Sequence, residues 1–138
     1  MTVTLTPQES EDYFYNALCN GLGYYLGSYG QTFTFNDIEY GLAKASYLEK
    51  ITLSGGVEQP HSVSYEDVLM EMLRMGYNLE FIDSDDDSLN KTLTLEMIHN
   101  RVQNAPFEHL SNMINENDDA ETADVIIQWT LYEDIIFG

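Results

Sequence analysis

Four aspartates lie within five positions in the segment 81–95, between two apolar runs. Carboxylates at alternate positions are typical of EF-hand calcium loops, which also need glycine at position 6 and glutamate at position 12. Counting from Asp83 gives acids at positions 1, 3 and 5, but position 6 is Ser88 and position 12 is Thr94. The flanking residues alternate as strands do. The segment therefore predicts a hairpin with a solvated loop, and no metal or other cofactor.

Other residues that carry chemistry do not form a known catalytic pattern. The three histidines, His61, His99 and His109, have no metal-ligand spacing. Cys19 lies within an apolar helical pattern and is predicted to be a packed core thiol. The glycines of the segment 21–27 follow a predicted helix, whereas a dinucleotide fingerprint follows a strand. We therefore expect no enzyme activity.

Charge is the most unusual property of the chain. Twenty-four Asp and Glu residues face five Lys and Arg residues, for a formal net charge of −19. Direct binding to nucleic acids or to anionic membranes needs Lys and Arg, so we expect neither. The chain has no apolar run near the ~20 residues that span a bilayer. With one cysteine and no signal-peptide pattern at its start, it is predicted to be cytoplasmic.

The acidic residues concentrate in two groups, which we take as candidate binding patches for a basic partner protein. The hairpin patch comprises Glu80, Asp83, Asp85, Asp86, Asp87 and Glu96, and the helix patch comprises Glu116, Asp118, Asp119, Glu121 and Asp124. The alternative interpretation is that both are solvated turns whose acidity only keeps the protein soluble. No pattern in the sequence predicts the oligomeric state.

Six helices are predicted from capping residues and from apolar spacing of three to four residues. They begin at Pro7 with a capping box of Thr6 and Glu9, then span about Asn36–Tyr47, the segment from Ser64 to Gly76, Leu95–Val102, Phe107–Ile114 and Glu121–Phe137. A recurrence at positions 33, 63 and 93 suggests that Thr34, Ser64 and Thr94 are N-caps, and Asp118 with Glu121 suggests a capping box for the last helix. The predicted core residues are Ile38, Leu42 and Ala45 in the second helix, Val68, Leu69, Met72 and Met75 in the third, and Val125, Ile126, Trp129, Tyr132 and Ile136 in the sixth.

Alternating segments predict the strands. They are Glu49–Ser54, Tyr77–Ile82 and Lys91–Leu95, with a short edge strand at Thr32–Thr34. The expected fold is α+β, a single domain over residues 1–138 with five or six helices packed on a small antiparallel sheet. The tyrosine-rich segment 21–35 is either part of the core or an exposed aromatic contact surface.

Two resemblances bear on function. The segment 65–138, from YEDVLMEMLRMG through HLSNMINENDD to the end, resembles small acidic proteins of unknown function from mobile elements and prophages of Bacteroidales. That resemblance carries no catalytic residue. Locally, GYNLEFIDS with the later MIHNRV is similar to part of the phage DNA-mimic protein Ocr, which is helical where we predict strands.

Together these features predict a non-enzymatic acidic interaction protein. It would bind a basic host protein in the manner of a DNA mimic. The alternative is a structural or assembly protein of a mobile element, with acidity that serves solubility only.

Overall fold

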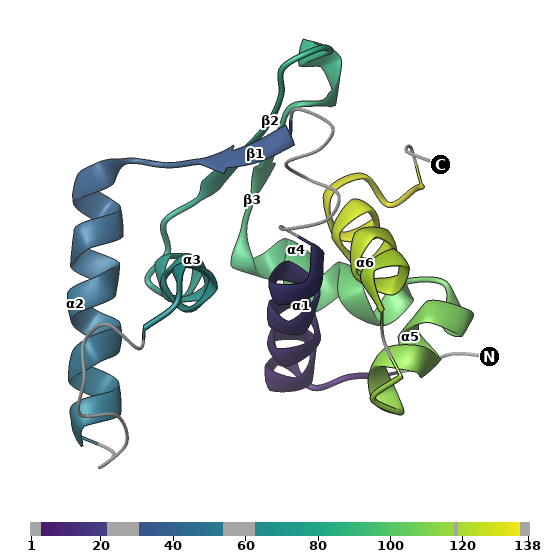
Figure 1. The fold of residues 1–138 in the computed structure, drawn as a ribbon, viewed down its shortest axis with the longest axis horizontal. Coiled ribbons are helices and arrows are strands. Elements are labelled where there is room, and N and C mark those ends of the chain that lie inside the picture. The colour runs from purple at the N-terminus through teal and green to yellow at the C-terminus, as the bar shows by residue number, and fades with distance from the viewer. Residues whose placement is uncertain (1–3, 22–30, 54–62, 118, 136–138) are drawn as a thin grey trace.

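The computed structural model describes residues 4–21, 31–53, 63–117 and 119–135. Within these ranges six α-helices pack with a three-stranded antiparallel sheet, which confirms the predicted α+β class (Figure 1). The helices are α1 (Pro7–Gly21), α2 (Asp37–Leu53), α3 (Tyr65–Arg74), α4 (Leu95–Arg101), α5 (Phe107–Ile114) and α6 (Ala120–Tyr132). Two short 3-10 turns are η4 (Asp87–Leu89) and η5 (Val102–Asn104), and the strands are β1 (Gln31–Thr34), β2 (Leu79–Asp83) and β3 (Lys91–Leu93).

The predicted hairpin is confirmed, and its two strands, β2 and β3, form the sheet together with β1. β2 lies in the centre and pairs antiparallel with β1 on one edge and with β3 on the other. Phe33 is opposite Phe81, with ring centroids 5.2 Å apart, and both are buried along with Leu93. The alternation of strand side chains thus places one face of the sheet in the core.

The helices lie on either side of α3 in two unequal groups. α3 packs against α2 on one side and against α1 on the other, and α1 also packs against α4 and α6. Figure 1 shows α2 standing apart at the edge of the molecule, with the sheet above α3. None of the helices in the described residues is long and apolar enough to cross a bilayer.

Side-chain caps explain where several helices begin. Thr6 and Glu9 form the predicted capping box of α1, each side chain accepting the other's backbone N–H at 3.1 and 2.9 Å. Ser64 and Asp67 form the same arrangement at α3. Thr94 caps α4 as predicted. These caps satisfy backbone donors that have no partner within the helix.

The beginning and end of α2 differ from the prediction. Asn36 caps the helix, not Thr34, because its Oδ1 accepts the N–H groups of Ile38 and Glu39 at 2.9 and 3.1 Å. Thr34 is the last residue of β1. The predicted strand Glu49–Ser54 is wrong, since residues 49–53 continue α2, and Ser54 lies outside the described residues.

A stripe of residues at helical spacing explains why α2 continues. Tyr40, Ala43, Tyr47 and Ile51 repeat every three or four residues, and α2 packs on α3. The continued helix brings Lys50 Nζ within 2.7 Å of Glu71 on α3. The alternation over residues 49–54 is too short to outweigh this longer pattern.

The predicted core face of α2 is also wrong. Ile38 is 74% exposed, Leu42 is 51% exposed and Ala45 is exposed, whereas Ala43 is buried. The sequence holds two apolar stripes on this helix. α2 has a single large helical neighbour, so one stripe is buried against α3 and the other faces outward.

Two further predictions about burial need correction. Cys19 is exposed and is not a core thiol. Met75 is 40% exposed because α3 ends at Arg74 and the chain turns at Gly76, whereas the other predicted core residues of this helix are buried.

The last helix is shorter than predicted and is capped by a different residue. α6 begins after Asp119, whose carboxylate accepts the Thr122 N–H at 2.9 Å, and ends at Tyr132. Glu133 then takes a left-handed conformation with φ of 55°, which stops the helix before Phe137. Of its predicted core residues, Val125 and Ile126 are buried, Trp129 and Tyr132 are half-buried, and Ile136 lies outside the described residues.

Candidate binding surfaces

The carboxylate of Asp83 shapes the hairpin loop. Asp83 is only 3% exposed, and its Oδ1 accepts the N–H groups of Asp85 and Asp86 at 2.8 and 3.0 Å. The N–H of Asp83 donates to Asn90 Oδ1 at 2.8 Å across the loop. These bonds replace the ladder bonds that end with the strands. Asp83 therefore turns the loop and leaves its neighbours at the surface.

The rest of the hairpin patch is exposed. Asp85, Asp86 and Asp87 form the tip, and Asp86 accepts both the N–H and the hydroxyl of Ser88. Glu80 lies on the outer face of β2, where both of its oxygens accept from the Thr92 hydroxyl, and Glu96 is exposed in the first turn of α4. The structure thus brings three carboxylates together at the tip, whereas Glu80 lies on β2 and Glu96 lies on α4.

The tip is held to α6 by a hydrogen bond. The hydroxyl of Tyr132 donates to the carbonyl oxygen of Leu89 at 2.7 Å. Burial, and then the charges of Asp83 and Asp86, raise the pKa of Tyr132 to about 12. The hydroxyl therefore remains protonated and a donor at neutral pH, and the loop keeps its position relative to the helix.

The helix patch lies around the start of α6. Asp119 is its N-cap, and the hydrogen bonds it accepts from Thr122 and its neighbours lower its pKa. Burial raises the pKa of Asp124, whose carboxylate accepts from Gln128 at 2.8 Å. Glu116 and Glu121 are exposed, and Asp118 lies outside the described residues. Two of these acids therefore have structural roles and two are open to a partner.

The two patches lie near opposite ends of α6 (Figure 1). The hairpin tip is next to its last turn, and Asp119 caps its first. A helix of 13 residues is about 20 Å long, at ~1.5 Å per residue. The structure therefore does not merge the two patches into one surface.

A network of ion pairs connects four helices in the interior. Arg74 Nε donates to Glu11 Oε1 at 2.8 Å, and Glu11 Oε2 lies 2.9 Å from His99 Nε2. Because an ionised carboxylate only accepts hydrogen bonds, His99 Nε2 is the donor. Glu71 has an exposed side-chain fraction of 1% and accepts from Lys50 Nζ and Ser46 Oγ, each at 2.7 Å.

The balance of charge in this network decides the protonation of Glu11. Burial raises the pKa of Glu11, but the hydrogen bonds from Arg74 and His99 lower it by more, so the net shift is downward. Arg74 Nη1 also lies 3.6 Å from Glu71 Oε1 and so joins the two acids. This network ties α1, α2, α3 and α4 together.

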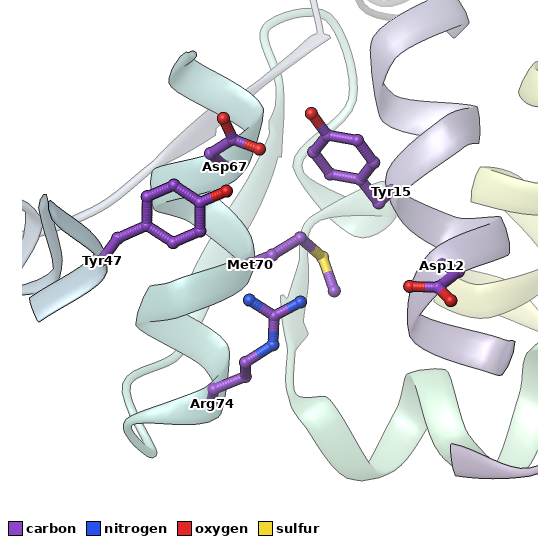
Figure 2. A pocket seen from close by; sticks show the side chains of 6 residues that line it. All are labelled: Asp12, Tyr15, Tyr47, Asp67, Met70 and Arg74. Atoms are coloured by element: carbon purple, nitrogen blue, oxygen red, sulfur yellow. The ribbon is translucent and has the colours of Figure 1, made fainter. Parts of the chain in front are cut away.

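Above the network, a pocket of about 260 Å³ opens between α1, α2 and α3 (Figure 2). It is lined by Asp12, Tyr15, Tyr47, Asp67, Met70 and Arg74. In Figure 2 the Tyr47 ring and the Asp67 carboxylate lie on one side, and Tyr15 and Asp12 project from α1 on the other.

The polar groups of this pocket already have hydrogen-bond or ion-pair partners, either in the pocket or beside it. Burial, and next the hydrogen bond to Asp67, raise the pKa of Tyr15. Asp67 also accepts the Ser64 N–H, and Arg74 is paired with Glu11. The pocket is therefore the solvent-facing edge of a structural network.

No family model, curated protein or solved structure matches this chain.

The histidines do not gather. His61 lies outside the described residues, His99 contacts Glu11, and His109 Nδ1 is 3.2 Å from the Thr122 hydroxyl. Among the residues that the structure describes, no group of three or more His, Cys, Asp or Glu side chains is arranged to hold a metal ion. Most of the tyrosine-rich segment, residues 22–30, lies outside the described residues, so both interpretations of that part stay predictions.

The interior network was absent from the sequence-based prediction. Glu71 and Arg74 are three residues apart, but Glu11 and His99 are far from them in the chain, so no spacing reveals the whole network. The sequence did contain one sign of this network. Glu11 lies three residues before Phe14, and Glu71 lies three after Val68, so both acids occupy apolar stripes. A carboxylate on such a stripe indicates a buried ion pair.

Proposed function

We propose that this protein is a non-enzymatic acidic interaction protein that holds a basic surface of a partner protein, in the manner of a DNA mimic. The observation that carries the proposal is the exposed group of Asp85, Asp86 and Asp87 at the tip of a hairpin. Their positions are set by the buried Asp83 and by the contact between Tyr132 and Leu89. A preorganised set of charges loses little conformational entropy on binding.

The placement of the cations supports the same function. Lys50 and Arg74 lie at the surface and are paired with the buried carboxylates of Glu71 and Glu11. Arg101 donates to the carbonyl oxygens of Thr130 and Leu131 and lies 3.4 Å from Glu133. Three of the five cations therefore serve internal contacts, and Lys91 on β3 is the cation of the hairpin that is left to offset its aspartates.

The mechanism would be electrostatic. Exposed carboxylates at the hairpin tip would occupy a groove that otherwise accepts DNA phosphates and would exchange with the partner's counterions. The helix patch, about 20 Å away along α6, gives a second contact for a partner with an extended basic surface. Association of this kind is fast at low salt and weakens as salt is added.

A capture experiment tests the proposal. We would immobilise the protein and the variant Asp85→Asn/Asp86→Asn/Asp87→Asn, and apply cell lysate at low and high sodium chloride. A matched control, Asp37→Asn/Glu49→Gln/Glu108→Gln, removes the same charge from exposed positions elsewhere. We expect a basic protein that the wild type and the control retain at low salt, that the tip variant loses, and that added duplex DNA releases. Equal capture by the tip variant and by the wild type would contradict the proposal.

A second function, assembly through an apolar surface, is favoured by one observation. Ile38 and Leu42 are 74% and 51% exposed on the outer face of α2. Large exposed apolar residues on neighbouring turns are typical of contact surfaces. A protein of this kind would use its acidity for solubility only. Light scattering would then show an oligomer that Leu42→Ser dissociates, with Ile114→Ser on α5 as the control.

A further inference from the structure

A second cleft, of about 450 Å³, lies where β1 ends, α2 begins and the chain turns from α3 into β2. Its volume falls within the ~300–1,000 Å³ typical of ligand sites. The residues that line it are Thr34, Phe35, Asn36, Glu39, Gly76, Tyr77, Asn78 and Glu80. Glu80 belongs to the hairpin patch, Thr34 and Phe35 belong to the tyrosine-rich segment, and the other five residues were not part of any predicted site.

The lining combines two carboxylates with two aromatic rings. Glu39 comes from α2 and Glu80 from β2, so the acids come from different elements, and none of the eight lining residues is Lys or Arg. Glu80 accepts from the Thr92 hydroxyl, but a carboxylate has about four lone-pair sites and keeps capacity for a ligand. Phe35 and Tyr77 are half-buried aromatic residues, and the face of an aromatic ring attracts cations.

The end of α3 places a partial negative charge beside the cleft, which Arg74 in the last turn offsets in part. Gly76, with φ of 90°, closes the helix, and the N–H of Tyr77 donates to the Met72 carbonyl oxygen at 3.0 Å. The cleft therefore borders the carbonyl end of α3, where the helix dipole favours a cation.

The start of α2, on the other side of the cleft, does not offer an anion site. The Oδ1 atom of Asn36 already accepts the N–H groups of Ile38 and Glu39. Asp37 and Glu39 in the first turn offset the positive end of the helix dipole. The charge of the cleft is thus complementary to a cation on both sides.

We propose that this cleft binds a basic side chain, Arg or Lys, that projects from a segment of the partner protein. Its cationic group lies between Glu39 and Glu80, and its aliphatic part lies against Phe35 and Tyr77. Ile38, 74% exposed beside Glu39, gives an apolar contact for the residue next to it in the partner. The inference rests on the proposed function and names a site where a basic partner would be held most specifically.

The test is an NMR titration of the ¹⁵N-labelled protein with the blocked peptide Gly-Arg-Ala-Arg-Gly. The same peptide with citrulline at both Arg positions keeps the shape and removes the charge. We expect amide shifts centred on residues 34–39 and 76–80 with the arginine peptide and none with the citrulline peptide. Glu39→Gln/Glu80→Gln should weaken binding about fivefold, since each exposed ion pair contributes modestly.

A charge-matched variant, Asp87→Asn/Glu96→Gln, should change the affinity by less than about twofold. Shifts centred on residues 85–87 or 116–124 would overturn the cleft and leave the proposed function standing. An arginine peptide that shifts no amide would overturn both. Equal weakening by the two double variants would show that net charge alone decides binding, which also overturns the cleft.

Discussion

The carboxylates of the interior and those of the hairpin tip are chemically alike, but they have opposite roles. Glu11 and Glu71 are buried, and each contacts cations from other helices. Asp85 and Asp87 are exposed at the end of a turn that other residues build. In the first region each charge joins secondary-structure elements, and in the second the charges face the solvent.

The difference shows where acidic residues lower the stability of the fold and where they raise it. A buried charge without its partner is strongly unfavourable, whereas an exposed charge is screened by water and salt. Substitution of the network residues should therefore destabilise the fold, and substitution at the tip should alter binding with little effect on stability.

The largest effect is expected for Arg74→Met. This change leaves Glu11 and Glu71 buried without the guanidinium that contacts both, and we expect the free energy of unfolding to fall by about 3 kcal/mol. Urea denaturation followed by circular dichroism measures it. The control is Lys44→Met, at an exposed position of α2, which should change the free energy by less than about 0.5 kcal/mol. Similar losses in the two variants would mean that the network is not what holds these helices.

A smaller effect is expected at Asp119, a member of the helix patch that also caps α6. Asp119→Ala removes the acceptor of the Thr122 N–H, and the melting temperature should fall by a few degrees. Asp119→Ser removes the same charge but keeps a capping oxygen, so it should melt close to the wild type. If Ser and Ala lower the melting temperature equally, the charge of Asp119 matters and its cap does not.

The pH dependence should show two acids with opposite signs. The folded pKa of Asp124 is raised above its ordinary 3.8 by burial, so its stabilising protonation is lost as pH rises through the folded pKa. The folded pKa of Glu11 is below its ordinary 4.5, so its contribution is present above 4.5 and is lost as pH falls through the folded pKa.

Mild acidification from neutral pH therefore protonates Asp124 before it protonates Glu11. The gain in stability from Asp124 comes before the loss of the contribution from Glu11. We expect the melting temperature to rise as the pH falls towards the raised pKa of Asp124, and to fall at more acidic pH, below 4.5, as Glu11 is protonated. In Asp124→Asn the rise should be smaller. A melting temperature that falls steadily from pH 7 would indicate that acids of the Glu11 kind dominate.

Local chemistry made much of the fold predictable. The caps at Thr6, Ser64 and Thr94 and the hairpin around the aspartates each depend on residues close in sequence. Such features follow from turn and capping preferences alone. The spacing of the aspartates between two alternating segments was therefore enough to identify the hairpin tip as an exposed acidic loop.

Features that depend on distant partners were not predictable. The alternation of residues 49–54 by itself favours a strand. The contact between Lys50 and Glu71 on α3 instead favours a continued helix. The two apolar stripes of α2 are equivalent in sequence, and the position of α3 decides that Ala43 is buried and Ile38 is not. The cleft between Glu39 and Glu80 likewise needs three elements to meet. In each case tertiary contact outweighs the local pattern.

The most direct test of the central claim, that the tip acids serve binding and not folding, is the melting temperature of Asp85→Asn/Asp86→Asn/Asp87→Asn. Asn at position 86 can still accept from Ser88, so the turn is preserved. At neutral pH and low salt we expect this variant to melt at or slightly above the wild type, because three repelling charges are gone. The wild type should gain more from added salt, as the Debye length falls to ~8 Å near 0.15 M. A variant that melts several degrees below the wild type, or a wild type destabilised by salt, would contradict the account.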